Sequence, residues 1–214
     1  MGARLAVPGA PDREIDAVLF DMDGTLVSSD AAVERAWVSW ADEYRVDRER
    51  VLAVAHGQPG ELTVRHVLPD LAVPAVRAAA QRQLELQYGD VADVRGTPGA
   101  AELTAALDRL RLPWAVVTLA DARLATARLG AAGIAPPLLV TARDVRAGKP
   151  DPEGYLLAAR RLGVDPARCL VVEDSRTGAA AGHAAGATVA TLKGVPGDLP
   201  LADLGELVPL LGPA

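Results

Sequence analysis

The sequence has little cysteine, little lysine and few aromatic residues. Its 214 residues include one cysteine, Cys169, and 3% aromatic residues. A single thiol cannot form an internal disulfide or a thiolate zinc site, so we expect a reducing compartment, the cytoplasm. Only two lysines, Lys149 and Lys193, stand among 20 arginines, a bias typical of coding composition. We expect Lys193 to be an ordinary surface residue.

The sequence also lacks a block of basic residues and a long apolar run. Its formal net charge is −6, whereas binding to nucleic acid by counterion release needs a basic stripe. No stretch of about 18 uninterrupted apolar residues is present, and the first thirteen residues contain no apolar signal segment. We therefore predict no nucleic-acid partner, no membrane association and a loose N-terminus. We expect a monomer or a weak dimer.

Short apolar runs alternate with helical patterns in the second half of the chain. Such alternation predicts a three-layer α/β core around a parallel sheet that is buried on both faces. Helix-end residues support this interpretation: Asp121 can cap a helix that runs to Gly130, and Asp151 with Pro152 can open a helix that stops at Gly163. The predicted strands are 17–20, 114–117, 138–140, 170–172 and 188–191.

The stretch 29–94, by contrast, shows helical periodicity and almost no strand signal. Val33, Trp37, Trp40 and Tyr44 form one apolar helix stripe, and a further helix is predicted over 73–88. Residues 29–94 are therefore predicted to form a helical domain that is inserted after the first strand of a core made of residues 1–28 and 95–214. From Leu199 onward we expect only a covering helix or loop.

An acidic motif directly follows the first predicted strand. Asp21 and Asp23 lie two residues apart beyond Phe20, and Gly24 permits a tight turn that presents backbone N–H groups to an anion. Ligands of open α/β sheets bind at the carboxyl ends of the strands. Taken alone, the motif can also be an acidic turn without chemistry.

Polar groups follow the other strands as well. Thr118 comes after the second strand and Lys149 after the third, while Glu173 and Asp174 come after the fourth. A parallel sheet gathers these groups at one edge, where a carboxylate can attack phosphorus, Mg²⁺ can be held by carboxylates, and Thr118 and Lys149 can bind the phosphate oxygens. The set predicts phosphoryl transfer.

In their order and spacing these motifs resemble those of the haloacid dehalogenase superfamily, in its magnesium-dependent phosphatase branch with a Rossmann-like core. The resemblance implies that Asp21 is the nucleophile and that Asp23 is the general acid and base, with its carbonyl on Mg²⁺. It also implies phosphate binding by Thr118 and Lys149, and completion of the metal site by Asp174 with Glu173. Dehalogenase members lack the second aspartate, so Asp23 favours a phosphatase.

The predicted insert is similar to the small helical cap of that superfamily. His56-Gly57-Gln58 and Arg65 resemble the cap of sugar and polyol phosphatases, which implies recognition of substrate hydroxyls. A solvated or capping side chain is an equal alternative for each of them. Two places depart from the family pattern: Leu119-Ala120 after Thr118, where many relatives have Ser or Asn able to add a donor, and Ser28, where many relatives have Asp.

Three functions fit these residues. The first is a Mg²⁺-dependent phosphatase for a small phosphorylated sugar or polyol, acting through an aspartyl phosphate. The second is a phosphosugar mutase similar to β-phosphoglucomutase, which returns the phosphoryl group to sugar from the same intermediate. The third is a non-catalytic binding protein that keeps the fold.

Overall fold

The computed structural model describes residues 2–55 and 59–213. The chain divides into two compact units. The first, called the core unit below, comprises Met1–Ser28 and Arg95–Ala214. The second, called the inserted unit, comprises Ser29–Val94.

A sheet of parallel strands forms the centre of the core unit. Its spatial order is β10-β9-β8-β3-β6-β7. Each apolar run that the sequence marks as a strand is part of this sheet, so the predicted parallel sheet is confirmed. The strands are β3 (Ala17–Phe20), β6 (Trp114–Val117), β7 (Leu139–Val140), β8 (Cys169–Glu173), β9 (Thr188–Thr191) and β10 (Leu199–Pro200).

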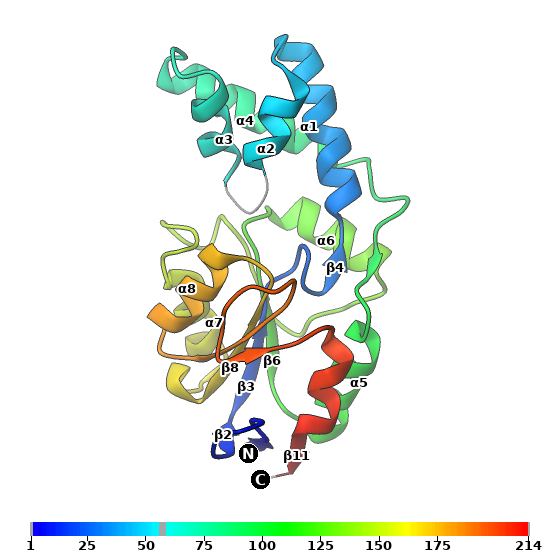
Figure 1. Ribbon diagram of the computed structural model, residues 1–214, viewed down its shortest axis with the longest axis vertical. Coiled ribbons are helices and arrows are strands. Elements are labelled where there is room, and N and C mark those ends of the chain that lie inside the picture. The colour runs from blue at the N-terminus through cyan, green and yellow to red at the C-terminus, as the bar shows by residue number, and fades with distance from the viewer. Residues whose placement is uncertain (1, 56–58, 214) are drawn as a thin grey trace. The chain divides into compact units, whose positions relative to one another are not determined.

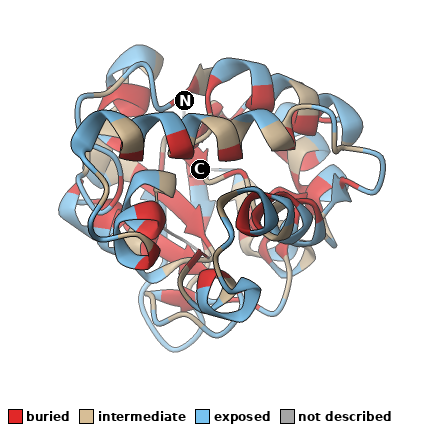
Figure 2. Cartoon of the chain, turned by 90° about the horizontal axis from the view of Figure 1, so that it is seen from above, coloured by how far each residue is buried: buried red, intermediate tan, exposed pale blue. Residues whose placement is uncertain are grey.

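Helices cover both faces of the sheet, which confirms the three-layer α/β class. α7 (Glu153–Leu162) and α8 (Arg176–Ala184) pack on one face, and α5 (Ala100–Leu110) and α6 (Ala122–Ala131) lie on the other (Figure 1). Successive strand residues point to opposite faces, so both layers bury apolar side chains against the sheet. The central strands β3, β6 and β8 are buried along their whole length (Figure 2).

The strand order places a topological switch point beside β3. From β3 the chain continues to β6 and β7 on one side, and then returns to β8 and β9 on the other side. In the register of β3 and β8, Phe20 lies opposite Val172, and the backbone N–H of Asp21 donates to Val172 O at 3.0 Å. The carboxyl ends of the two strands therefore open at the same place, where open α/β sheets bind ligands.

The predicted start of α6 and the predicted end of α7 are right, and the end of α6 and the start of α7 each lie one residue later than predicted. Asp121 caps α6, because its side chain accepts from the Leu124 N–H. The N-cap of α7 is Pro152, one residue later than predicted, and Asp151 instead accepts from the Glu153 N–H at 2.9 Å. Gly163 ends α7 in the left-handed conformation, as predicted, with φ 73°.

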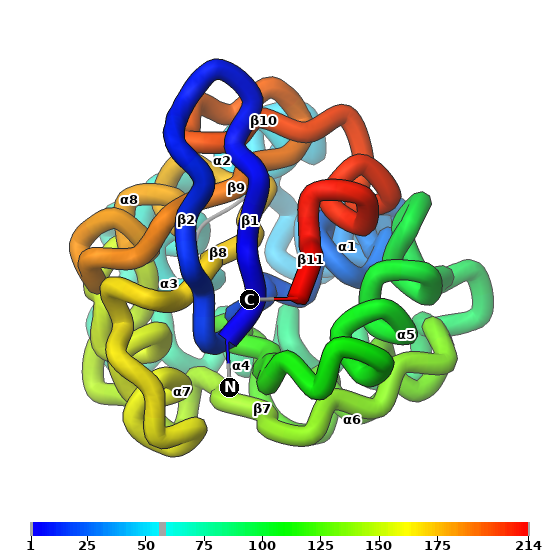
Figure 3. The backbone as a smooth tube through the Cα atoms, turned by 90° about the horizontal axis from the view of Figure 1, so that it is seen from below, coloured from blue at the N-terminus to red at the C-terminus, as the bar shows by residue number. Residues whose placement is uncertain are grey.

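The termini form a second, antiparallel sheet, so the predicted loose N-terminus is wrong. β1 (Ala3–Leu5) pairs on one side with β2 (Arg13–Ile15) and on the other with β11 (Leu211–Pro213) (Figure 3). The strands are too short to show periodicity in the sequence, yet Leu5 and Ile15 are buried. The segment from Leu199 is also more than a cover, since it supplies β10 and β11 around the 3₁₀ helix η2 (Leu204–Leu210).

Three short elements complete the core unit. β4 (Val27–Ser28) and β5 (Arg95–Gly96) pair with each other where the chain leaves and re-enters the core unit. The 3₁₀ helix η1 (Pro166–Arg168) leads into β8. No helix in the described part of the chain is both long and apolar enough to cross a membrane.

The inserted unit is a bundle of helices around an aromatic interior. The predicted stripe lies on α1 (Asp30–Tyr44), where Trp37 and Trp40 are buried edge to face with ring centroids 5.3 Å apart. Two short helices fill the stretch between the two that were predicted. The remaining helices are α2 (Arg48–Ala55), α3 (Gly60–Val67) and α4 (Val73–Gln87).

Candidate active site

Asp21 follows the last residue of β3, and a tight turn follows Asp21. Gly24 adopts the left-handed conformation with φ +84°, and its N–H donates to Val27 O at 2.7 Å. A Cβ at Gly24 would lie 2.0 Å from Asp174 Oδ2, so glycine is required for space as well as for backbone conformation. The turn thus brings the strand end of Asp21 and the acidic pair after β8 into contact.

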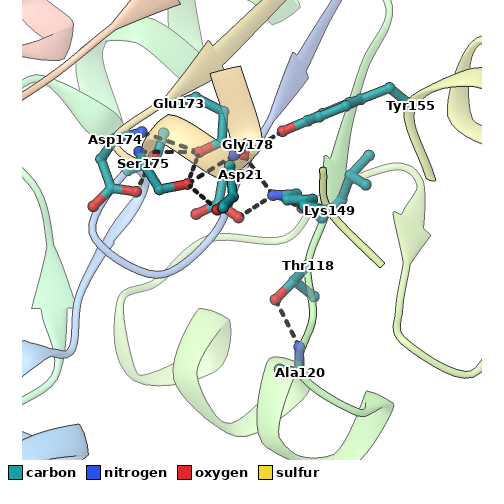
Figure 4. A network of polar contacts seen from close by, with 12 residues as sticks. Asp21, Thr118, Ala120, Lys149, Tyr155, Glu173, Asp174, Ser175 and Gly178 are labelled. Carbon is teal, nitrogen blue, oxygen red and sulfur yellow. Dashed lines mark hydrogen bonds and ion pairs between the residues drawn. The ribbon is translucent and has the colours of Figure 1, made fainter. Parts of the chain in front are cut away.

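Lys149 lies between two carboxylates beneath this turn. Its Nζ makes an ion pair with Asp21 Oδ1, lies 2.7 Å from Glu173 Oε1, and donates to Val117 O at 3.0 Å. The side chain is 7% exposed. Figure 4 shows Asp21, Lys149 and Glu173 pointing toward one another, so three strand-end segments far apart in the sequence meet at one ammonium group.

Glu173 is fully buried and both of its oxygens have partners within the protein. Oε1 accepts from Tyr155 OH at 2.7 Å in addition to Lys149, and Oε2 accepts from Ser175 Oγ at 3.0 Å and from the Asp174 N–H at 3.2 Å. A Cβ at Gly178 would lie 1.8 Å from Oε1, so the bare backbone of α8 makes room for the carboxylate. These contacts fix Glu173 as a support beneath Asp21 and Lys149.

Burial and charge act together on the titration of this cluster. Burial raises the pKa of Asp21 well above its usual value, with Lys149 opposing the rise and Glu173 and Asp174 adding to it. Burial disfavours the ammonium form of Lys149, yet Asp21 and Glu173 outweigh it and raise the pKa of Lys149. Burial also raises the pKa of Tyr155 well above its usual value, so Tyr155 remains a neutral donor.

Three carboxylates provide a site that fits a divalent cation. Ligand oxygens of Asp21, Glu173 and Asp174 all lie within 4.8 Å of one another. Hard oxygen donors of this kind suit Mg²⁺ and similar divalent ions. Lys193 is exposed, as predicted, with 45% of its side chain accessible, but it is not an ordinary surface residue, because its Nζ lies 2.9 Å from Asp174 Oδ2. The left-handed conformation of Lys193, φ +52°, was not visible in the sequence.

Thr118 lies on the other side of Lys149, just beyond β6. It is 5% exposed, and its Oγ1 accepts from the Ala120 N–H at 3.0 Å. Because that lone pair is engaged, the hydroxyl hydrogen is directed elsewhere and can be donated to an oxygen of a ligand. Together Thr118 and Lys149 offer one neutral and one charged donor.

Asp23 lies apart from the acidic group that could hold a cation. Its Oδ1 makes an ion pair with Arg128 Nη1 at 2.7 Å, and its side chain is 29% exposed. The sequence reasoning did not consider Arg128. The signal was a charged residue on the buried face of α6, where Leu124, Ala125 and Leu129 are its buried neighbours.

The other predicted residues belong to the inserted unit. Arg65 is an exposed residue of α3, whose buried residues are Thr63, Val64 and Val67. His56, Gly57 and Gln58 lie outside the described residues. The structure therefore brings together Asp21, Lys149, Glu173 and Asp174, with Thr118 and Asp23 beside them, all from the core unit.

The chain is similar in sequence to a known family and to known phosphatases. Residues 15–186 match the family described as haloacid dehalogenase-like hydrolase. Hexitol phosphatase A of Escherichia coli is 39% identical over 191 residues, covering 89% of this chain and 88% of the relative. Glycerol-1-phosphate phosphohydrolase 2 of Saccharomyces cerevisiae is 34% identical, covering 82% of this chain and 74% of the relative.

A solved structure has a similar fold. CbbY from Rhodobacter sphaeroides, determined in complex with phosphate, aligns with a TM-score of 0.78 at 26% identity and covers 90% of this chain and 96% of its own. The family model covers most of the chain, and the relatives align over most of both chains. The chain belongs to the haloacid dehalogenase-like hydrolases.

Proposed function

We propose that the protein is a Mg²⁺-dependent phosphatase that hydrolyses a small phosphorylated sugar or polyol through an aspartyl phosphate on Asp21. The observation that carries the proposal is the meeting of Asp21, Lys149 and Glu173 at the carboxyl edge of the sheet. The relatives are a hexitol phosphatase and a glycerol-1-phosphate phosphohydrolase, whose substrates are phosphorylated polyols, and this supports the substrate class.

In the first step, a carboxylate oxygen of Asp21 attacks phosphorus and the bond to the ester oxygen breaks. Asp23 gives its proton to the departing oxygen, which leaves as an alcohol. Lys149 and Thr118 hold the other phosphate oxygens and stabilise the charge of the transferring group. Lys149 is suited to this role because Glu173 and Tyr155 beneath it fix the position of its ammonium group.

In the second step, the Asp23 carboxylate takes a proton from water. The water oxygen attacks phosphorus, the bond to Asp21 breaks, and inorganic phosphate leaves. Asp21 is again a carboxylate and Asp23 again carries a proton. The 29% exposure of Asp23 is consistent with its reaching both the substrate oxygen and water.

Asp21 and Asp174 would hold the cation, joined by the main-chain carbonyl of Asp23 as the family resemblance implies. Glu173 would support them, because both of its oxygens already accept hydrogen bonds from protein groups. When bound, Mg²⁺ offsets the repulsion between these carboxylates and an anionic substrate. Lys193 would compete for Asp174 and limit the affinity for the cation.

We assign the inserted unit the role of a cap that selects the substrate. Arg65 is exposed and can donate to hydroxyl groups, and His56 and Gln58 carry the same chemistry by the family resemblance. A cap also excludes bulk water, which strengthens electrostatic interactions at the reacting group.

The test is phosphate release by the purified protein with Mg²⁺ across sugar, polyol, nucleotide and glycolate phosphates. We expect release to equal substrate consumed, fastest for a sugar or polyol phosphate, and to stop with a chelator and recover with Mg²⁺. Consumption of a hexose phosphate without phosphate release would identify a mutase instead.

Asp21→Asn separates enzyme from binding protein. We expect kcat to fall by roughly 10⁴-fold or more, because the nucleophile is lost. The matched control is Asp12→Asn, the same chemical change at an exposed residue of the core unit, which should leave kcat unchanged. An Asp21→Asn protein as active as wild type would exclude the aspartyl-phosphate route.

A further inference from the structure

Arg128 is a buried charge on the sheet-facing side of α6. Its side chain is 2% exposed, among the buried residues Leu124, Ala125 and Leu129 of the same helix. The buried face of an amphipathic helix ordinarily carries apolar residues. Replacing a buried ion pair with apolar residues of similar volume often leaves the protein equally or more stable. Stability alone therefore does not account for an arginine at this position.

Arg128 contacts the carboxylate to which we assign proton transfer. Nη1 lies 2.7 Å from Asp23 Oδ1, across 105 residues of sequence. A hydrogen bond with a charged donor such as a guanidinium group is among the stronger ones in proteins. Asp23 is held from its backbone as well, by a bridge to Val27 and by the Gly24 turn.

The helix that carries Arg128 is itself anchored at the phosphate-binding side. Asp121 caps α6 three residues after Thr118, and Arg128 lies seven residues further on, about two helical turns along the same face. α6 therefore ties the position of Asp23 to that of the loop that contains Thr118. A guanidinium group on this rigid element fixes the direction of the Asp23 side chain.

We propose that Arg128 is a positioning residue that holds the Asp23 carboxylate in place for proton transfer to the departing oxygen and from the attacking water. The inference rests on the role given to Asp23 in the proposed function. In the proposed mechanism Arg128 acts through Asp23, so its loss should affect the proton-transfer steps while leaving substrate binding nearly intact.

Arg128→Leu tests this with two substrates that differ in their need for a proton. Glycerol 1-phosphate releases an alkoxide oxygen that must be protonated, whereas p-nitrophenyl phosphate releases a stable phenolate. For glycerol 1-phosphate we expect kcat to fall about 10²-fold with KM within a few-fold of wild type. For p-nitrophenyl phosphate we expect a rapid burst of one nitrophenolate per enzyme, followed by slow turnover, because only the attack of water still needs Asp23.

Combination with Asp23→Asn gives a second readout that a purely structural role would not produce. If Arg128 acts through Asp23, the double variant should be no slower than Asp23→Asn alone. Arg128→Lys keeps the charge without the planar fork and should recover part of the lost kcat. Arg109→Leu, an exposed arginine of α5, is the matched control and should behave as wild type.

The inference would be overturned if folded Arg128→Leu had the kcat of wild type. It would also be overturned if kcat fell equally on both substrates without a burst, or if the losses of kcat in the double variant with Asp23→Asn were additive. If Arg128→Leu fails to fold, Arg128→Lys undergoes the same burst and double-variant measurements, with the same outcomes deciding. Failure of the proposed function is distinguishable, since it requires that wild type release no phosphate or that Asp21→Asn stay active.

Discussion

The two units of this protein place their charges in opposite ways. The core unit buries Lys149, Glu173 and Arg128, with side-chain exposures of 7%, 0% and 2%. The inserted unit keeps its ion pairs at the surface, where Arg35 pairs with Asp90 and Asp93 and has a side chain that is 47% exposed. Arg48 and Arg82 follow the same pattern, pairing with Asp42 and Glu43.

The interiors differ accordingly. The inserted unit is closed by aromatic packing, with Trp40 between Trp37 and Tyr44 and its ring stacked on Tyr44 at 4.5 Å. The core unit has an apolar interior too, but its strand ends converge on ionised groups whose desolvation costs free energy. Among the residues that the structure describes, the buried charged side chains belong to the core unit, and Lys149, Glu173 and Arg128 lie where the chemistry is proposed.

Among the variants that test this difference between the units, Lys149→Met should cause the largest losses of stability and of activity. Removal of the ammonium group leaves Asp21 and Glu173 buried without their shared cation, which typically costs about 3–5 kcal/mol of unfolding free energy. We also expect kcat to fall by at least about 10²-fold, because a donor to the transferring group is lost. Urea denaturation and phosphate release measure the two effects. A variant as stable as wild type would show that the buried cluster needs no lysine.

Trp40→Ala should destabilise the inserted unit by as much as Lys149→Met destabilises the core unit, or by less. Loss of a fully buried indole costs about 3–5 kcal/mol, and Trp40 Nε1 also donates to Ala79 O at 2.8 Å. Hydrogen exchange should rise in α1 and α4 and remain unchanged in β3 and β8, while Leu62→Ala at an exposed position changes neither. Equal loss of protection in the core strands would show that the two units unfold together.

Gly178→Ala tests how closely the core unit is built around Glu173. The added methyl group would collide with the carboxylate, and overpacking of this kind costs about 1–3 kcal/mol. We expect lower kcat along with lower stability, because Glu173 positions Lys149. The control is Gly130→Ala in α6, where a Cβ meets no atom within 4 Å and should add about 0.5–1 kcal/mol of stability. Full activity in Gly178→Ala would contradict the support assigned to Glu173.

Arg48→Ala should have the smallest effect. Its pair with Asp42 is bidentate yet exposed, and exposed pairs contribute little because water and salt screen them. We expect the melting temperature and kcat of the variant to match wild type. A clear loss of stability would mean that the surface ion pairs of the inserted unit contribute to stability as the buried ion pairs of the core unit do.

The sequence predicted those parts that depend on chain order and strand ends. Asp21 and Lys149 come after strands and Glu173 ends β8, and the carboxyl-end rule brings them together once the sheet is parallel. Lys193 and Arg128 escaped this reasoning because their roles depend on where a loop and a helix face lie in space. Tyr155 was missed for the same reason, since helical periodicity shows that α7 is amphipathic without showing which carboxylate its hydroxyl reaches.

The N-terminal β1 and β2 were missed for a different reason. Three-residue strands give too few alternations to be told from a loop, and the partner strand β11 lies at the other end of the chain. Pairing between distant short strands leaves no local signal in either of them.

The pairing of β3 with β8 has a consequence for the time at which activity can arise. Asp21 is made before its two partners, since Lys149 follows 128 residues later and Glu173 later still. Long-range pairing of this kind forms slowly, because a large loop must close before any contact repays the lost chain entropy. A nascent chain that has not yet emerged through β8 can pair β3 with β6, but it lacks Glu173 and the second neighbour of β3, so catalytic competence should appear only after β8 has been made.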